Sequence, residues 1–363
     1  METLAMPPSL YIEVLSRLGC GNAVISGPKV ELEEISMRDN TVVVGDINIR
    51  IPDKYQFDDI LTGLQREDNV VNFRMKFKQN EMLPVLIEND ANGIYSRERI
   101  FASPPSLTAD QCYNIVCQCG GILGNVCPGR ILALPPRGWR SQSLEWFCCV
   151  KHSPDKVEPK KRDILYNAFS VSVHNSNICQ TVETQHCDTK NRQIVVVKCI
   201  MCDRDLGDAE ESWVNLWSHN ISFMADLEVS PDPTGIVPSE VFCDPNVKTP
   251  SECFNRVIRA YVREKIEKMP KFLIRNRKDD ACLLWAFDSN LTVLAGNQTG
   301  VEDFVFMKIL FKTTKIEGDE SVDTIFLSDD LYETGLHDMV QSTRNLPQSF
   351  RFINGYQCAY IIK

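Results

Sequence analysis

The chain has 363 residues, of which 43% are hydrophobic and 24% are charged, and this composition excludes a disordered or fibrous chain. Such a length accommodates two or three structural units. The formal net charge of −10 excludes a chain that is drawn as a whole to nucleic acid or to anionic lipid.

The first part of the chain, residues 1–105, is predicted to be a β-rich unit. Short runs of apolar residues alternating with polar ones occupy residues 30–35, 41–44, 47–51 and 72–78. Alternation with period two is typical of antiparallel strands that have one solvated face. At the end of this part, residues 101–110 contain two consecutive prolines and are expected to form a linker.

The second part, residues 106–229, is predicted to be a cysteine-rich β domain that binds zinc. It holds ten of the fifteen cysteines, between Cys112 and Cys202, among short strands and turns. A break rich in proline and glycine at residues 230–235 follows it.

The third part, residues 230–363, is predicted to be an α+β unit. Apolar residues at helical spacing predict a helix over 251–268, which Ser251 can cap and Pro270 ends. A hairpin is expected with strands at 282–287 and 291–295, which flank Asp288, Ser289 and Asn290. Beyond it we expect three elements: a buried strand at 304–311, a helix at 329–343 and a mostly extended tail at 349–362. The predicted fold class is therefore α+β, mostly antiparallel β.

Two close cysteine pairs indicate a metal site. Cys117 and Cys119 precede Gly120, and Cys199 and Cys202 form a CxxC. Zinc prefers four soft ligands in a tetrahedron, and two turns that carry two thiolates each supply them. We therefore predict a structural zinc held by these four cysteines.

The same cysteines are also compatible with roles that need no metal. They could be small buried hydrophobic residues, or the CxxC could be a redox pair, although the βαβ pattern of such proteins is missing. The first pair is one residue shorter than a usual zinc knuckle, so Cys112 or Cys127 could replace one of its members.

A second metal site is a further possibility. Cys148, Cys149, His186 and Cys187 could form it, with Cys179 nearby. Because two adjacent cysteines cannot easily reach one metal ion together, packing of these thiols in the core is the alternative.

The compartment is expected to be reducing. The amino terminus has Glu2, Pro7 and Pro8 where a secretory signal needs basic residues and an apolar run. No apolar stretch approaches the ~20 residues of a membrane-spanning helix. We therefore expect a cytoplasmic and nuclear protein, whose cysteines are metal ligands or core residues rather than disulfides.

Several motifs, taken in chain order, resemble the HECT-like ubiquitin-ligase family. They are Cys117-Gln118-Cys119-Gly120, Leu132-Ala133-Leu134-Pro135 with Trp139, Glu145-Trp146-Phe147-Cys148-Cys149, His186-Cys187, Lys198-Cys199-Ile200-Met201-Cys202, Leu206-Gly207, Asn345 to Arg351 and Gln357 to Tyr360. The resemblance implies binding of a ubiquitin-conjugating enzyme and transfer of ubiquitin to substrates, cyclins among them. It also implies a link to the endonuclease that cleaves pre-mRNA at 3′ ends, which members of the family bind and hold inactive.

No catalytic cysteine is identifiable from the sequence. Cys358 lies near the chain end but in an apolar strand, where a core position is expected rather than an activated thiolate. We therefore expect a ligase-like protein that acts by bringing a conjugating enzyme near its substrate. The alternative is a non-catalytic inhibitor or stabilising partner of the 3′-end processing endonuclease.

Overall fold

The computed structural model describes residues 8–28, 30–78, 107–134, 158–167, 170–189, 192–225, 249–264, 270–278, 280–314 and 322–362. The chain divides into two compact units. Unit 1 comprises residues 1–95, 284–312 and 339–363, and unit 2 comprises residues 96–283 and 313–338. The predicted boundaries near residues 105 and 229 lie outside the described residues, so the division into three parts stays a prediction.

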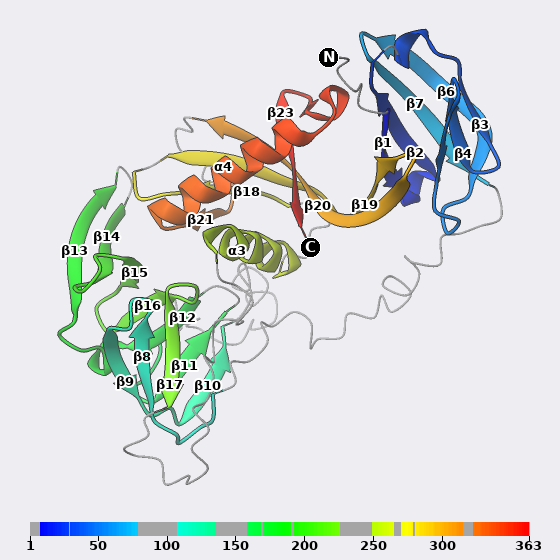
Figure 1. Cartoon of the computed structure of the whole chain (residues 1–363). Coiled ribbons are helices and arrows are strands. Elements are labelled where there is room, and N and C mark those ends of the chain that lie inside the picture. Colours follow the sequence, from blue (N-terminus) through cyan, green and yellow to red (C-terminus); the bar gives the residue numbers. More distant parts are fainter. Residues whose placement is uncertain are drawn as a thin grey trace, which may run out of the picture. The chain divides into compact units, whose positions relative to one another are not determined.

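Unit 1 is built around a large antiparallel sheet. Along this sheet the strands follow the order β22, β23, β20, β19, β1, β2, β7, β6. All of them except β22 are labelled in Figure 1. Their bounds are β1 (Ser9–Leu15), β2 (Cys20–Ser26), β6 (Phe57–Glu67), β7 (Val70–Phe77), β19 (Ala281–Asn297), β20 (Gly300–Thr314), β22 (Phe352–Ile353) and β23 (Tyr356–Ile362). Strands β19 and β20 contribute residues 284–297 and 300–312 to this unit.

A smaller sheet of β3 (Ile35–Arg38), β4 (Thr41–Val44) and β5 (Ile47–Arg50) shares a core with this large sheet. Buried residues of both sheets meet in that core, among them Ile12, Val42, Ile49 and Phe57. Strands β4, β5 and β7 therefore confirm the strands that the alternating pattern predicts at 41–44, 47–51 and 72–78.

The strand predicted at residues 30–35 is wrong over most of its length. Residues Val30–Leu32 form a 3-10 helix, and strand β3 begins only at Ile35. The reason is hydrogen bonding outside a strand ladder: Glu33 N donates to the carbonyl oxygen of Val30 within the turn, and the distant Arg66 donates through Nη1 to the carbonyl oxygen of Glu33, at 2.9 Å. These hydrogen bonds satisfy the backbone carbonyl groups of Val30 and Glu33 without a neighbouring strand.

The hairpin predicted around residues 288–290 is also wrong. Strand β19 continues through these residues without a turn, and the reversal comes after Asn297. There Asn297 accepts hydrogen bonds from the backbone N and the Oγ1 of Thr299, at 2.8 and 2.6 Å. Asn290 N still donates to Asp288 Oδ1 at 2.9 Å, a contact typical of turn-forming residues, but the strand runs on into the ladder that β19 forms with β1 from Thr292 to Gly296.

Unit 2 contains two β-sheets around one core. The larger has the order β10, β11, β12, β16, β15, β14, β13, and the smaller has the order β17, β8, β9. The bounds are β8 (Tyr113–Cys117), β9 (Ile122–Val126), β10 (Arg130–Ala133), β11 (Asp163–Tyr166), β12 (Ser170–His174), β13 (Val182–Thr189), β14 (Arg192–Cys199), β15 (Asp205–Ala209), β16 (Trp213–Trp217) and β17 (Ile221–Ala225). The shared core contains Ile115, Val197, Leu216 and Phe223.

Within the described residues there are two α-helices, α3 (Pro250–Glu264) and α4 (Asp329–Asn345). They confirm the helices predicted near 251–268 and 329–343, although residues 265–269 lie outside the described part. The cap of α3 is Thr249 rather than Ser251. Thr249 Oγ1 accepts from Glu252 N at 3.2 Å and Thr249 N donates to the Glu252 carboxylate at 2.9 Å, which makes a capping box.

Strands β18 (Lys271–Arg275) and β21 (Thr324–Phe326) pair in parallel in unit 2, as do β10 and β11. The other strand pairs described are antiparallel, which confirms the α+β, mostly antiparallel fold class. Neither described helix is long and apolar enough to cross a membrane.

Candidate metal centre

The first cysteine pair lies in the turn between β8 and β9. Cys117 is the last residue of β8, and its N–H and carbonyl bond to Gly121 O and Gly120 N, each at 2.8 Å. Gly120 has a φ of 89°, a left-handed conformation that glycine adopts without steric cost. This tight turn places the thiols of Cys117 and Cys119 on the same side of the hairpin end.

The second pair lies in the turn between β14 and β15. Cys199 ends β14, its carbonyl oxygen accepts from Asp203 N at 2.8 Å, and its N–H donates to Arg204 O at 3.0 Å. Asp203 takes the left-handed conformation, with a φ of 55°. The hydrogen bond from Asp203 to Cys199 therefore closes the turn and brings Cys202 beside Cys199.

The structure brings all four predicted cysteines together. The sulfur atoms of Cys117, Cys119, Cys199 and Cys202 lie within 4.8 Å of one another. The distances from Cys117 Sγ to Cys202 Sγ and from Cys119 Sγ to Cys199 Sγ are both 3.7 Å. A tetrahedral zinc–thiolate site with bonds of about 2.3 Å places its sulfur atoms about 3.8 Å apart. Number, chemistry and spacing of the donors therefore fit such an ion.

The geometry also bears on the roles that need no metal. Cys119 and Cys202 are exposed, so they do not act as buried hydrophobic residues, whereas Cys117 and Cys199 are buried. Each of the two close sulfur contacts joins one turn to the other and not the two members of the CxxC. This arrangement fits a ligand set that the two turns could share.

Cys112 and Cys127 do not contribute to the centre. They form a disulfide with a Cα–Cα distance of 4.1 Å, which closes the open end of the β8–β9 hairpin. The expectation that the cysteines do not form disulfides is therefore wrong for this pair. Cross-strand positions beside the pair Tyr113 and Val126 bring the two thiols within bonding distance.

The surroundings of Cys117, Cys119 and Cys202 shift the pKa values of their thiols in different directions. Burial raises the pKa of Cys117 above its ordinary range, and burial also raises the pKa of Cys202. The backbone N–H of Gly121 stabilises the thiolate of Cys119 and lowers the pKa of that thiol to about 7. Metal binding requires thiolates, so loading the centre would release protons from Cys117 and Cys202 at neutral pH.

Backbone contacts hold the two turns together. Asn220 bonds to both: its carbonyl oxygen accepts from Gln118 N in the first turn at 3.3 Å. The side-chain amide of Asn220 donates to Asp205 O, after the second turn, at 2.6 Å. On another side, Ile200 N donates to Thr181 O at 3.1 Å, and Thr181 Oγ1 donates to Ile122 O. No sequence signal marks Asn220 or Thr181, because neither carries a side chain typical of a metal site.

The second metal site stays a prediction. Cys148 and Cys149 lie outside the described residues. His186 is exposed on β13 with Cys187 next to it, and Cys179 is an exposed free thiol.

Cys358 occupies a core position in unit 1. It is fully buried on β23, among Leu310, Leu346 and Phe350. Burial raises the pKa of its thiol to about 12. The expectation that Cys358 is a core residue is confirmed.

Fold and site together define a mostly antiparallel β protein with a four-cysteine centre that could hold a metal ion. The chain belongs to the HECT-like ubiquitin-conjugating enzyme (E2)-binding family, whose model matches residues 13–358. No curated protein and no solved structure matches the chain. The family membership confirms the resemblance seen in the motifs and supports binding of a ubiquitin-conjugating enzyme. Ligase activity, cyclins, the 3′-end processing endonuclease and the cytoplasmic and nuclear location stay predictions.

Proposed function

We propose that this protein binds a ubiquitin-conjugating enzyme charged with ubiquitin and promotes transfer of the ubiquitin to a substrate. The observation that carries the proposal is the family match, which extends from residue 13 to residue 358. Both units contribute residues to that span, so the match supports a role for the whole described fold rather than for one segment.

The thiols of the described residues favour recruitment over a covalent relay. A thioester-forming ligase needs an accessible thiolate, and Cys358 is fully buried with a thiol pKa of about 12. The exposed free thiols among the described residues are Cys119 and Cys202, which belong to the metal centre, and Cys179. Holding the charged enzyme and the substrate together would accelerate transfer by proximity alone.

We further propose that the metal is zinc and that its role is structural. The four sulfur donors are the set that zinc prefers when no position stays open for a substrate. When bound, zinc would supply folding free energy by joining the turns at the ends of the β8–β9 and β14–β15 pairs. The centre would thereby stabilise the domain rather than take part in the transfer reaction.

A binding experiment tests the first proposal. The full chain is immobilised, and purified ubiquitin-conjugating enzymes are passed over it one at a time, with free ubiquitin as the control. We expect saturable binding of at least one of these enzymes. The Cys199→Ser variant should lose that binding together with its metal, and failure of every enzyme to bind the metal-loaded wild type would contradict the proposal.

A transfer experiment tests the second step. A conjugating enzyme preloaded with ubiquitin is mixed with the chain, and loss of its thioester is followed with free lysine as the acceptor. We expect faster discharge with the wild type and equally fast discharge with the Cys179→Ser and Cys358→Ala variants. A ubiquitin adduct on the chain that a thiol reductant removes would show a covalent relay instead.

A further inference from the structure

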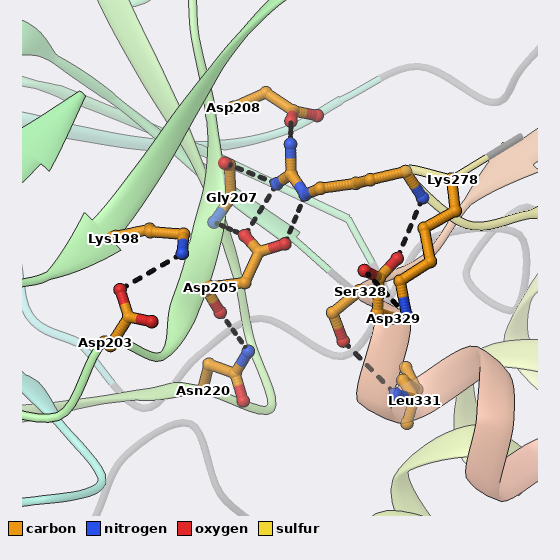
Figure 2. A network of polar contacts seen from close by, with 11 residues as sticks. Lys198, Asp203, Asp205, Gly207, Asp208, Asn220, Lys278, Ser328, Asp329 and Leu331 are labelled. Atoms are coloured by element: carbon orange, nitrogen blue, oxygen red, sulfur yellow. Dashed lines mark hydrogen bonds and ion pairs between the residues drawn. The ribbon is translucent and has the colours of Figure 1, made fainter. Parts of the chain in front are cut away.

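Arg277 joins two parts of unit 2 that are far apart in sequence. Its guanidinium binds the carboxylate of Asp205 through Nε and Nη2, the latter at 2.6 Å. Nη2 also donates to Gly207 O at 2.9 Å, and Nη1 lies 3.2 Å from the Asp208 carboxylate. Figure 2 shows Asp205, Gly207 and Asp208 grouped on the β15 side of this network and Lys278 with Asp329 on the other.

Asp205 belongs to the immediate surroundings of the metal centre. It is the first residue of β15, and the carbonyl oxygen of its neighbour Arg204 accepts from Cys199 N. Its own carbonyl oxygen accepts from the Asn220 side chain, and Asn220 O in turn accepts from Gln118 N between Cys117 and Cys119. Asp205 is therefore linked to the first cysteine turn through Asn220, and its neighbour Arg204 is bonded to Cys199 of the second turn.

The other end of the network is the beginning of α4. The backbone N of Arg277 donates to Asp329 Oδ1 at 3.0 Å, and Asp329 is the first residue of the helix. The ammonium of Lys278 lies 3.1 Å from the Glu333 carboxylate and 3.8 Å from that of Asp329. Asn276 and Asp280 are joined to each other by two further hydrogen bonds, at 3.0 and 2.8 Å.

The ion pair at the centre of this network is largely shielded. The side chains of Arg277 and Asp205 are 15% and 17% exposed. A planar guanidinium that bonds a carboxylate through two nitrogens fixes both distance and orientation, which a lysine ammonium cannot do. Arg277 thus contacts Asp205 through its side chain and Asp329 through its backbone N–H.

We propose that Arg277 is a positioning residue of the metal centre, which couples metal binding by the four cysteines to the order of residues 276–278 and of the first turn of α4. The inference rests on the proposed binding of zinc. It assigns the Arg277 side chain a role that the family match does not address, because it links the centre to a helix that carries no metal ligand. Partners that orient a metal site are expected to change its affinity by about tenfold when altered.

The experiment uses the full chain with zinc alone as the ligand. Zinc affinity is measured by competition with a chromophoric chelator, and amide hydrogen exchange is measured with and without zinc. We expect the wild type to gain protection at residues 199–207 and 329–333 together on loading. Arg277→Lys keeps the charge but loses the two-point bond, so it should bind zinc about tenfold more weakly and lose the linked protection of 329–333.

The control is Arg130→Lys. Arg130 also bonds a carboxylate through two nitrogens, at 2.9 and 2.7 Å to Asp163, but on β10 at the far edge of the same sheet. The Arg130→Lys variant should leave zinc affinity unchanged. If the wild type binds no zinc, the metal proposal and this one fall together. If zinc binds but exchange at 329–333 does not respond in the wild type, only the coupling is overturned, and this result holds even if Arg277→Lys does not fold.

Discussion

Glu13 and Lys308 form a buried ion pair across 295 residues of sequence, with 2.6 Å between the lysine Nζ and the glutamate Oε1. Their side chains are 2% and 5% exposed. The hydroxyl of Tyr360 also donates to Glu13, so strands β1, β20 and β23 meet at this one carboxylate. A buried pair of this kind stabilises little by itself, but loss of one partner leaves an unpaired charge in the core.

We therefore predict that Lys308→Met lowers the free energy of unfolding by about 3–5 kcal/mol. The double variant Glu13→Gln, Lys308→Met removes both charges and keeps an acceptor for Tyr360, so it should recover most of this loss. Lys54→Met, which removes the exposed pair with Asp303, is the control and should cost less than about 1 kcal/mol. Denaturant unfolding of the full chain measures all three, and a double variant as unstable as the single one would contradict the role assigned to the unpaired charge.

Native mass spectrometry should find one zinc ion per chain. Cys199→Ser should lose the ion and lower the melting temperature, because the metal contributes folding free energy. Cys282→Ala is the matched control, since Cys282 is equally buried in unit 2 but lies outside the centre. It should retain the ion despite some loss of packing. A metal-free sample with the melting temperature of the loaded one would count against a structural role.

The thiol of Cys358 should resist alkylation at neutral pH in the folded chain and react in denaturant. Its pKa is raised from 9.0 to about 12 by burial, so the folded state keeps a proton that the unfolded state releases. Stability from this group is complete below pH 9 and is lost as the pH rises toward 12. The free energy of unfolding measured across that range should fall less steeply with pH in Cys358→Ala. Rapid modification of the folded chain at pH 7 would refute the buried placement.

Gly335→Ala should destabilise unit 2 even though alanine is the better helix former. A Cβ at Gly335 in α4 would lie 2.2 Å from Cδ2 of Phe254, a fully buried ring in α3. Overpacking of this kind costs about 1–3 kcal/mol, against about 1 kcal/mol of helix propensity gained. Thermal unfolding should show the net loss, and Phe254→Leu combined with Gly335→Ala should relieve it. A Gly335→Ala variant more stable than the wild type would show that α3 and α4 can move apart enough to accommodate the added methyl group.

Sequence patterns predict the parts of the molecule that depend on close neighbours. The CxC and CxxC spacing identifies the four thiols of the centre, because each pair sits within a single turn. Apolar spacing in the same way locates the helix predicted at 251–268, which is α3. The prediction is wrong where two local signals compete, as for the cap of α3. Ser251 has the side chain of a helix cap, but Thr249 lies three positions before Glu252 and forms the capping box with it. Pro250 then takes the first helical position.

Contacts between distant residues are not predictable from one sequence. Arg277 and Asp205 are 72 residues apart, and nothing in either segment marks the other as its partner. The same holds for Asp288 to Asn290, whose turn-forming residues lie inside a long strand because pairing with other strands decides the conformation. The disulfide between Cys112 and Cys127 escapes prediction for a different reason, since an expected reducing compartment argues against any such bond.

That disulfide gives the β8–β9 hairpin two ends with opposite chemical requirements. Its turn carries thiols that must stay reduced to bind a metal ion, whereas its base is closed by a bond that a sufficiently strong reductant opens. A strong reductant added to protect the ligands would free the base, and an oxidant that preserves the base would threaten the ligands. Purified material should therefore differ between buffers of different redox potential, and the metal content of the chain should be compared only between samples prepared in one of them.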